Sequence, residues 1–256
     1  MLSTPSTSHV CFDHVYEPAE DSFLLLDTIS SESEVTFLQE RFNRASTNPP
    51  LVLEVGVGSG VVLAFTAANA SNIFGRTDVL TLGTDINSFA CKAAVQTVQN
   101  AIEEKDHPKS ILLDIVNGDL ASVIRPHSID VLIFNPPYVP AELPDFTRHE
   151  HFNNLPTGKD KTTFEQDSYL LELSYAGGED GMVVTRRMLG QVKDLLNVGR
   201  GVAYVLLCAQ NRPENVKKEI LAWGQGWMAE TVGTSGNKAG WEKLQILRIW
   251  RKTSPS

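Results

Sequence analysis

The sequence has no excess of positive charge, no closely spaced cysteines and no long apolar run. Lys and Arg number 22 against 31 Asp and Glu, giving a net charge of -9, so we expect no overall basic surface for a nucleic-acid backbone. The three cysteines, Cys11, Cys91 and Cys208, lie far apart, so neither a disulfide framework nor an internal metal site is expected. The longest apolar runs, near residues 61–68 and 202–209, are too short to cross a bilayer, and the polar N-terminus has no secretory pattern. The protein is therefore predicted to be cytoplasmic or nuclear, with neither membrane nor nucleic acid as a direct partner.

The composition is that of one globular domain. Hydrophobic residues make up 42% and charged residues 21% of the 256-residue chain, and no Pro/Ser/Gly-rich linker divides it. We predict a disordered tail at residues 1–12, a single domain at 13–250 and a short tail at 251–256. Residues 139–175 show no strand pattern and contain several prolines, so we expect a lid or a disordered insertion there.

One strand end organises the rest of the chain. Residues 129–134 contain five apolar residues and one Asp, which predicts a buried strand. Pro136 and Pro137 must end that strand, because neither can donate a hydrogen bond to a ladder. Asn135 is left at the carboxyl end, where open α/β sheets bind their ligands. The alternative is a plain strand-ending turn whose Asn caps local backbone.

A glycine-rich turn follows the first predicted strand. Residues 51–55 lead into Gly56-Val57-Gly58-Ser59-Gly60 and then into an apolar helix. Backbone without Cβ atoms lets a ligand approach the helix N-terminus, so this pattern predicts a nucleotide-cofactor cradle. The pattern is GxGxG, and Val61 shows that the pyrophosphate fingerprint GxGxxG is absent. An NAD-dependent oxidoreductase is therefore disfavoured.

Two further strand ends carry carboxylates. The second predicted strand ends at Asp85, where a carboxylate can accept hydrogen bonds from a ribose; a helix-capping carboxylate is the alternative. The third is followed by Asp119 and Leu120, where the carboxylate could accept from an adenine amine and the backbone could meet the ring. With Asn135, this spacing predicts a purine nucleoside lying across a parallel sheet.

An acidic stretch near the N-terminus has the pattern of a helix start. Pro18 suits a first helical position, and Glu20-Asp21-Ser22 suit the positive end of the helix dipole. From these residues alone, we predict a solvated first turn.

Together these motifs resemble those of class I S-adenosylmethionine-dependent methyltransferases that modify planar nitrogens. The shared motifs are Leu53-Glu54-Val55-Gly56-Val57-Gly58-Ser59-Gly60, Asp85, Gly118-Asp119-Leu120 and Asn135-Pro136-Pro137-Tyr138. The stretches Tyr16-Glu17-Pro18-Ala19-Glu20-Asp21-Ser22 and Tyr175-Ala176-Gly177-Gly178 are similar to those of the HemK-type glutamine methyltransferases in their short eukaryotic form. The resemblance implies an α/β fold: a seven-stranded, mostly parallel sheet in the order 3-2-1-4-5-7-6, with the last strand antiparallel and helices on both faces.

The resemblance also implies a reaction and its residues. The family methylates N5 of the glutamine in the Gly-Gly-Gln motif of class I translation release factors, so the substrate would be that factor, alone or with its GTPase partner. The residues implied for cofactor binding are Tyr16, Ser22, Glu54, Gly56, Gly58, Asp85, Asp119, Leu120 and Asn135. Those implied for catalysis are Asn135, Pro136 and Tyr138, and Pro137 joins them in substrate binding. The Asn135 oxygen and the Pro136 carbonyl would accept the amide N–H groups while Tyr138 packs on the flat amide.

A second subunit is also implied. Only residues 1–50 precede the first strand, too few for the N-terminal recognition bundle of bacterial members, so substrate recognition is expected from the 139–175 segment or from a second subunit. The family's eukaryotic form acts with a small zinc-binding activator subunit. Independently, Ile111 to Val116 has five large apolar residues and one charge, and the implied strand order places it at a sheet edge. An edge that apolar is an aggregation hazard unless it is covered. We expect a heterodimer at this edge; coverage by the chain's own helices is the alternative.

Other functions stay open on sequence alone. The N6 amine of DNA adenine offers the same planar NH2 group, but such an enzyme needs basic contacts to phosphates. A protein lysine is a further substrate class, although its ammonium must first lose a proton. A non-catalytic scaffold that binds the cofactor is an alternative of another class. Detecting the transferred methyl group on DNA or on protein distinguishes a DNA substrate from a protein substrate. Any turnover excludes the non-catalytic scaffold.

Overall fold

A seven-stranded sheet forms the centre of the computed structural model, which describes residues 2–42, 48–105, 109–156, 161–236 and 243–252. The strands are β1 (Leu51–Val55), β2 (Leu80–Asp85), β3 (Ile111–Asn117), β4 (Val131–Phe134), β5 (Val202–Cys208), β6 (Trp227–Thr234) and β7 (Leu244–Arg251). Their order is β3-β2-β1-β4-β5-β7-β6. The strands from β3 to β5 pair in parallel, whereas β7 runs antiparallel to both β5 and β6. The predicted fold class and strand order are confirmed.

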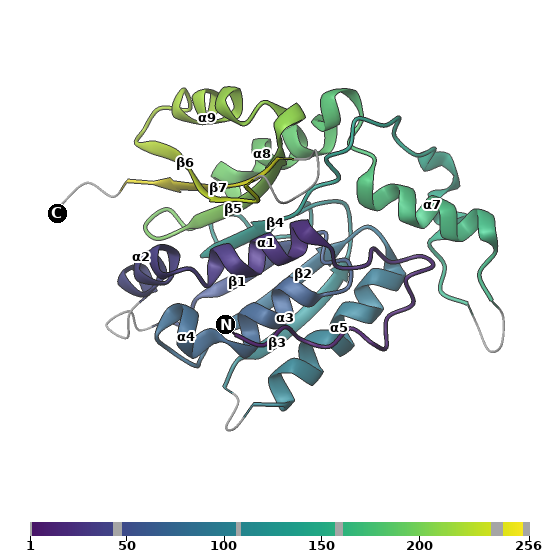
Figure 1. The fold of residues 1–256 in the computed structure, drawn as a ribbon, viewed down its shortest axis with the longest axis horizontal. Coiled ribbons are helices and arrows are strands. Elements are labelled where there is room, and N and C mark those ends of the chain that lie inside the picture. The colour runs from purple at the N-terminus through teal and green to yellow at the C-terminus, as the bar shows by residue number, and fades with distance from the viewer. Residues whose placement is uncertain (1, 43–47, 106–108, 157–160, 237–242, 253–256) are drawn as a thin grey trace.

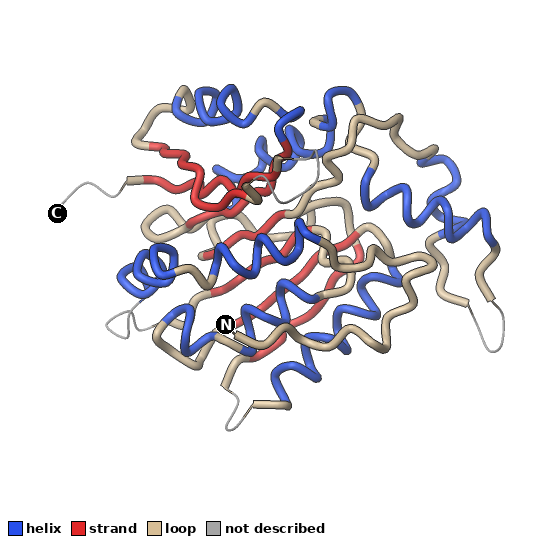
Figure 2. The backbone as a smooth tube through the Cα atoms, in the orientation of Figure 1, coloured by secondary structure: helices blue, strands red, loops and turns tan. Residues whose placement is uncertain are grey.

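Helices cover both faces of this sheet (Figure 1 and Figure 2). One face carries α1 (Glu20–Ile29), α2 (Glu32–Phe42), α3 (Val61–Ala68), α4 (Ala70–Phe74) and α5 (Ser88–Glu103). The other face carries α8 (Val183–Leu195) and α9 (Pro213–Leu221). Successive strand residues point to opposite faces, so Val52 packs in the first core and Leu53 in the second. The sheet is therefore buried on both sides, which explains its nearly continuous apolar strands.

Capping residues fix two of the helix starts. The Asn87 side chain accepts hydrogen bonds from the backbone N of Phe89 at 2.9 Å and of Ala90 at 3.4 Å, so it caps α5. Pro213 opens α9 in its first turn. α1 begins at Glu20, so Pro18 precedes the helix instead of opening it.

The insertion at 139–175 contains regular structure. Its elements are η1 (Phe146–Arg148), α6 (His149–Phe152) and α7 (Phe164–Tyr175), and residues 157–160 lie outside the described part. Phe152, Tyr169 and Leu170 pack with Val10 and Val15 in a third apolar cluster. Residues 2–12, the described part of the predicted disordered tail, thus lie against the domain, with Val10 buried.

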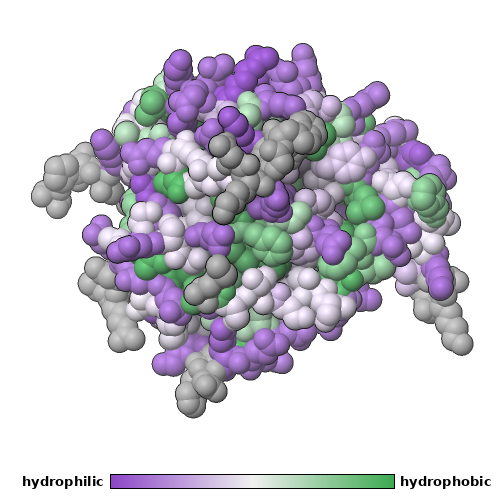
Figure 3. Space-filling view, viewed as in Figure 1, coloured by the Kyte–Doolittle hydropathy of each residue, from purple (hydrophilic) through white to green (hydrophobic). Residues whose placement is uncertain are grey.

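On the face shown in Figure 3, polar side chains surround more apolar ones near the centre. β3 forms one edge of the sheet, and Ile111 and Leu113 on it are 54% and 50% exposed.

At the C-terminus, Arg251 belongs to β7, while residues 253–256 of the predicted tail lie outside the described part. Every helix among the described residues is too short or too polar to span a lipid bilayer.

Candidate active site

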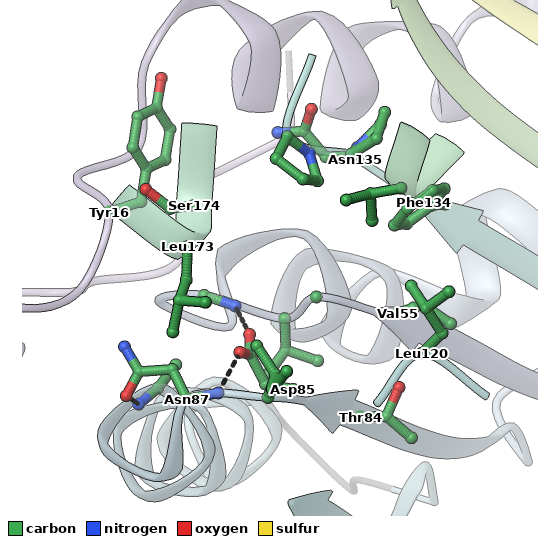
Figure 4. A pocket seen from close by; sticks show the side chains of 18 of the residues that line it. Tyr16, Val55, Thr84, Asp85, Asn87, Leu120, Phe134, Asn135, Leu173 and Ser174 are labelled. Atoms are coloured by element: carbon green, nitrogen blue, oxygen red, sulfur yellow. Dashed lines mark hydrogen bonds between the residues drawn. The ribbon is translucent and has the colours of Figure 1, made fainter. Parts of the chain in front are cut away.

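A pocket opens at the carboxyl ends of β1, β2 and β4, and residues of α7 form one of its walls (Figure 4). The predicted residues that line it are Tyr16, Ser22, Glu54, Gly56, Gly58, Asp85, Asp119, Leu120, Asn135, Pro136 and Pro137. The remaining predicted residue, Tyr138, lines an adjoining small cavity with Cys208 and Lys243. The fold therefore brings the predicted strand ends together as a parallel sheet requires.

The glycine turn presents bare backbone to this pocket. Gly56, Gly58 and Gly60 have φ angles of 70°, 51° and 79°, in the left-handed region that favours glycine. A Cβ atom on Gly60 would collide with Ala94 of α5, whereas one on Gly58 would meet open space. Gly60 therefore serves close packing between helices, and Gly58 leaves its backbone open to the pocket.

Asp85 binds backbone and also faces the pocket. Its Oδ2 accepts from Gly58 N at 2.9 Å, and its Oδ1 accepts from Asn87 N at 2.8 Å (Figure 4). Burial raises the pKa of Asp85 to about 6, and these backbone hydrogen bonds oppose the shift. Because each carboxylate oxygen has a second lone pair, the group can still accept from a ligand. Asn87, and not Asp85, caps α5.

Glu54 has a different environment. Its side chain is buried, and its Oε2 accepts from the backbone N of Leu63 in α3 at 2.8 Å. Burial raises the pKa of Glu54 well above its usual range. Although Glu54 lines the pocket, its carboxylate holds the first turn of α3 behind the glycine turn.

The turn after β3 carries an ion pair that the sequence patterns did not reveal. Arg187 of α8 pairs with Oδ2 of Asp119, and both side chains line the pocket. The next residue, Leu120, is buried with a φ of 53°, an unusual conformation for a residue other than glycine. Arg187 stands outside every motif considered, so only the fold brings it to Asp119.

The first turn of α1 is buried, so the prediction of a solvated turn is wrong for two of its residues. Asp21 and Ser22 are 3% and 5% exposed, and α1 packs against α3, β6 and β7. Asn135 Nδ2 donates to Asp21 Oδ2 at 3.0 Å. A carboxylate accepts but does not donate when ionised, so this contact fixes the orientation of the Asn135 amide. Asn135 Oδ1 is buried and has no hydrogen-bond partner among the described residues.

Asn211 and two glycines pack against the backbone of the Asn-Pro-Pro-Tyr turn. The amide of Asn211, which is 3% exposed, donates to the carbonyls of Tyr138 at 3.3 Å and Asp180 at 3.0 Å. Gly177 and Gly181 lie so close to the carbonyls of this turn that no Cβ atom would fit. Gly177 belongs to a stretch that carries the family resemblance, whereas no local pattern indicates Gly181 or Asn211, because both lie against the Tyr138 carbonyl, which is distant in sequence.

The insertion supplies much of the apolar lining. Its lining residues are Leu143, Pro144, Phe146, Leu170, Leu173 and Ser174, and Ala176 follows directly after it. Apolar walls with a few converging polar groups are typical of small-molecule sites. The segment predicted to be a lid or a disordered loop therefore forms part of the pocket itself.

Comparison with known proteins gives relatives along nearly the whole chain, although no protein-family model matches it. The eRF1 methyltransferase catalytic subunit mtq2 of Schizosaccharomyces pombe is 33% identical over 254 residues, covering 98% of this chain and 96% of the relative. Methyltransferase HEMK2 of Homo sapiens is 32% identical, covering 97% and 96%. A putative protein N5-glutamine methyltransferase of Methanocaldococcus jannaschii is 28% identical, covering 93% and 92%.

Proposed function

Because the chain belongs to the family of HemK-type glutamine methyltransferases, we propose that it methylates the glutamine of the Gly-Gly-Gln motif in a class I translation release factor. The methyl donor is S-adenosylmethionine and the acceptor atom is the side-chain nitrogen N5. One observation carries the proposal: Asn135 lines the pocket with a buried acceptor, Oδ1, that lacks a hydrogen-bond partner among the described residues. A planar NH2 group supplies the donor that this atom needs. Action on a termination factor would place the protein in the cytoplasm.

The pocket fits S-adenosylmethionine, which supplies a methyl group on a positively charged sulfur. Gly56 and Gly58 offer backbone without side chains, and Asp85 offers carboxylate lone pairs suited to ribose hydroxyls. Asp119 and Leu120 line the part of the pocket proposed for the adenine. Tyr16 and Ser22 close it from the N-terminal side, and Glu54 supports the glycine turn.

Asn135 and Pro136 would orient the amide that is methylated. A glutamine nitrogen is a poor nucleophile because its lone pair is delocalised into the carbonyl. The Asn135 side-chain oxygen and the Pro136 carbonyl can accept its two N–H groups, which fixes the nitrogen and reduces that delocalisation. The two prolines, Pro136 and Pro137, hold these acceptors rigidly, so less entropy is lost in aligning them. Methylation makes the nitrogen acidic, and its proton leaves through Asn135 Oδ1 to water without a dedicated base.

Tyr138 would contact the substrate from the adjoining cavity. That cavity is lined by Tyr138, Cys208 and Lys243 among others, and Tyr138 directly follows Pro137, which lines the main pocket. We assign Tyr138 to packing on the flat amide.

We further propose that a small zinc-binding activator subunit covers the edge strand β3. Ile111 and Leu113 lie on one face of this strand and are half exposed. An unpaired edge with apolar side chains favours association with another chain. Leu113→Lys should therefore abolish heterodimer formation in size-exclusion chromatography. Val198→Lys, at an apolar residue that is 57% exposed away from this edge, should leave it intact; equal heterodimer yields would contradict the assignment.

Mass spectrometry of a eukaryotic release factor tests the function directly. The factor is incubated with this chain and labelled S-adenosylmethionine, with and without the activator, and DNA is offered in a parallel reaction. One added methyl on the Gly-Gly-Gln glutamine, dependent on the activator, is the expected result. Label on DNA or on lysine would instead favour another nitrogen substrate, and cofactor binding without any turnover would favour a scaffold.

A further inference from the structure

One helix on the far face of the sheet holds the turn that follows β3, and we propose that Arg187 of this helix, α8, is a positioning residue. It sets the carboxylate of Asp119 to accept a hydrogen bond from the 6-amino group of the adenine, and so helps the enzyme select that base. The inference rests on the proposed function, because it takes the cofactor's adenine to lie beside Asp119.

The first observation is the ion pair itself. Arg187 binds Oδ2 of Asp119, and Oδ1 makes no hydrogen bond to another described residue. Both side chains line the pocket, and both are about half exposed, at 47% and 48%. A carboxylate with one oxygen held and the other open presents a single acceptor in a fixed direction.

The second observation is that α8 binds the same turn at another point. Gln191 lies one helical turn after Arg187 and therefore on the same face of α8. Its Oε1 accepts from the backbone N of Ala121 at 3.3 Å. Between the two attachment points lies Leu120, buried with a φ of 53°. Such a conformation persists only where the surroundings hold it, so Arg187 and Gln191 form a clamp on this turn.

The clamp has consequences for affinity and for base selection. A carboxylate that is ordered before the ligand arrives loses less side-chain entropy on binding, an effect of about 3- to 10-fold in affinity. Adenine presents an N–H donor at position 6, whereas hypoxanthine presents an oxygen acceptor that would face the Asp119 oxygen. A fixed Asp119 therefore rejects hypoxanthine, and an Asp119 free to turn toward solvent rejects it less.

Calorimetry with two ligands tests this role. S-adenosylhomocysteine and its hypoxanthine analogue are titrated into the wild type, Arg187→Gln and the matched control Arg186→Gln. Arg186 is the neighbouring exposed arginine of α8, so the control makes the same charge change on the same helix. We expect Arg187→Gln to bind S-adenosylhomocysteine about 3- to 10-fold more weakly and to discriminate less between the two bases. Arg186→Gln should match the wild type in both.

Two results would overturn the inference. One is equal affinity and equal base discrimination in the two variants. The other is a rise in the KM for the release factor without any change for the two small ligands, which would make Arg187 a substrate contact. A change in melting temperature alone would show a structural role, since that role leaves the ratio of the two affinities unchanged. If the wild type itself fails to bind S-adenosylhomocysteine, the proposed function fails instead.

Discussion

Two carboxylates near the N-terminus are each buried in a polar cluster. One cluster stabilises the fold, and the other borders the pocket. Glu34 of α2 is 1% exposed; its Oε2 accepts from the Tyr204 hydroxyl at 2.8 Å and its Oε1 from Arg248 at 2.8 Å. Asp21 of α1 is 3% exposed and accepts from Asn135 at 3.0 Å. Each carboxylate thus joins an N-terminal helix to a distant part of the chain. We call them the Glu34 cluster and the Asp21 cluster.

The polar atoms left without partners separate the two clusters. In the Glu34 cluster, Arg248 Nε lacks a hydrogen-bond partner among the described residues, but the Arg248 guanidinium lies 3.9 Å from the ring centroid of Phe37, and a cation–π contact covers it. In the Asp21 cluster, the unpaired atom is Asn135 Oδ1, and Asn135 lines a pocket. Leaving a buried acceptor unpaired costs about 1–3 kcal/mol. A buried, unpaired polar atom therefore indicates a ligand site when its residue borders a cavity. When an aromatic ring covers its group, it indicates a structural contact.

The largest effect is expected from breaking the Glu34 cluster. Glu34→Ala leaves the Arg248 charge largely buried and removes the partner of the Tyr204 hydroxyl. The free energy of unfolding in urea should fall by about 3–5 kcal/mol, with no change in affinity for S-adenosylhomocysteine below the transition. Glu32→Ala, at an exposed position on the same helix turn, is the control and should change stability by less than about 0.5 kcal/mol. Loss of cofactor affinity in folded Glu34→Ala would contradict the division between the clusters.

The next largest effect is expected on catalysis. Asn135→Ala removes the acceptor that we assign to the substrate amide, a hydrogen bond worth about 1–3 kcal/mol. Once the loss of alignment is included, methyl transfer should fall by about two decades or more. Calorimetry should show that S-adenosylhomocysteine still binds. Near-normal turnover with the cofactor bound would refute the assigned role.

A smaller effect should follow from freeing Asn135 without removing it. Asp21→Ala deletes the carboxylate that orients the Asn135 amide, so the amide can present Nδ2 in place of Oδ1. We expect kcat to fall by about tenfold, corresponding to about 1.4 kcal/mol, while the KM for the release factor changes little. Glu20→Ala, at the exposed neighbouring position, should leave kcat unchanged. Equal kcat values in the two variants would mean that Asp21 does not orient Asn135.

The sequence predicted the residues of the site whose positions follow from local pattern. Asp85 ends β2, Asn135 directly follows β4 and Asp119 lies two residues after β3, and parallel strands bring such ends to one edge of the sheet. Asp21 and Arg187 could not be assigned in this way, because their contacts depend on how α1 and α8 pack against strands far along the chain. The first turn of a helix that is rich in acidic residues has the same sequence pattern whether the turn is exposed to solvent or buried.

The insertion was hard to predict for a similar reason. Phe152, Tyr169 and Leu170 give no regular pattern along the chain, yet they pack with Val10 and Val15. Phe89 and Ala90 of α5 belong to the same apolar cluster, so the packing of both segments depends on contacts between parts of the chain that are far apart in sequence. A prediction from local pattern treats both as loops.

The smallest effect is expected on the pH dependence of cofactor affinity. It concerns Asp85, a third buried carboxylate, and shows how a carboxylate in the pocket affects both stability and binding. Burial raises the pKa of Asp85 to about 6 from the usual 3.8. Between pH 3.8 and about pH 6, the folded protein binds more protons at Asp85 than the unfolded chain does. The free energy of unfolding therefore falls as pH rises through this range. Binding has the opposite sign, since ribose hydroxyls favour the ionised carboxylate. Affinity for S-adenosylhomocysteine should rise with pH and level off above about pH 7.

Calorimetry from pH 5 to pH 8 checks this, with Asp85→Asn as the reference. At pH 5 the wild type should bind about tenfold more weakly than on its plateau, because one unit below the pKa roughly a tenth of the carboxylates are ionised. The Asp85→Asn variant should bind weakly at every pH and with little slope. Its free energy of unfolding should also lack the fall between pH 4 and 6 that Asp85 contributes. A slope that survives in this variant would assign the titration to another group, of which the buried Glu54 is the nearest candidate.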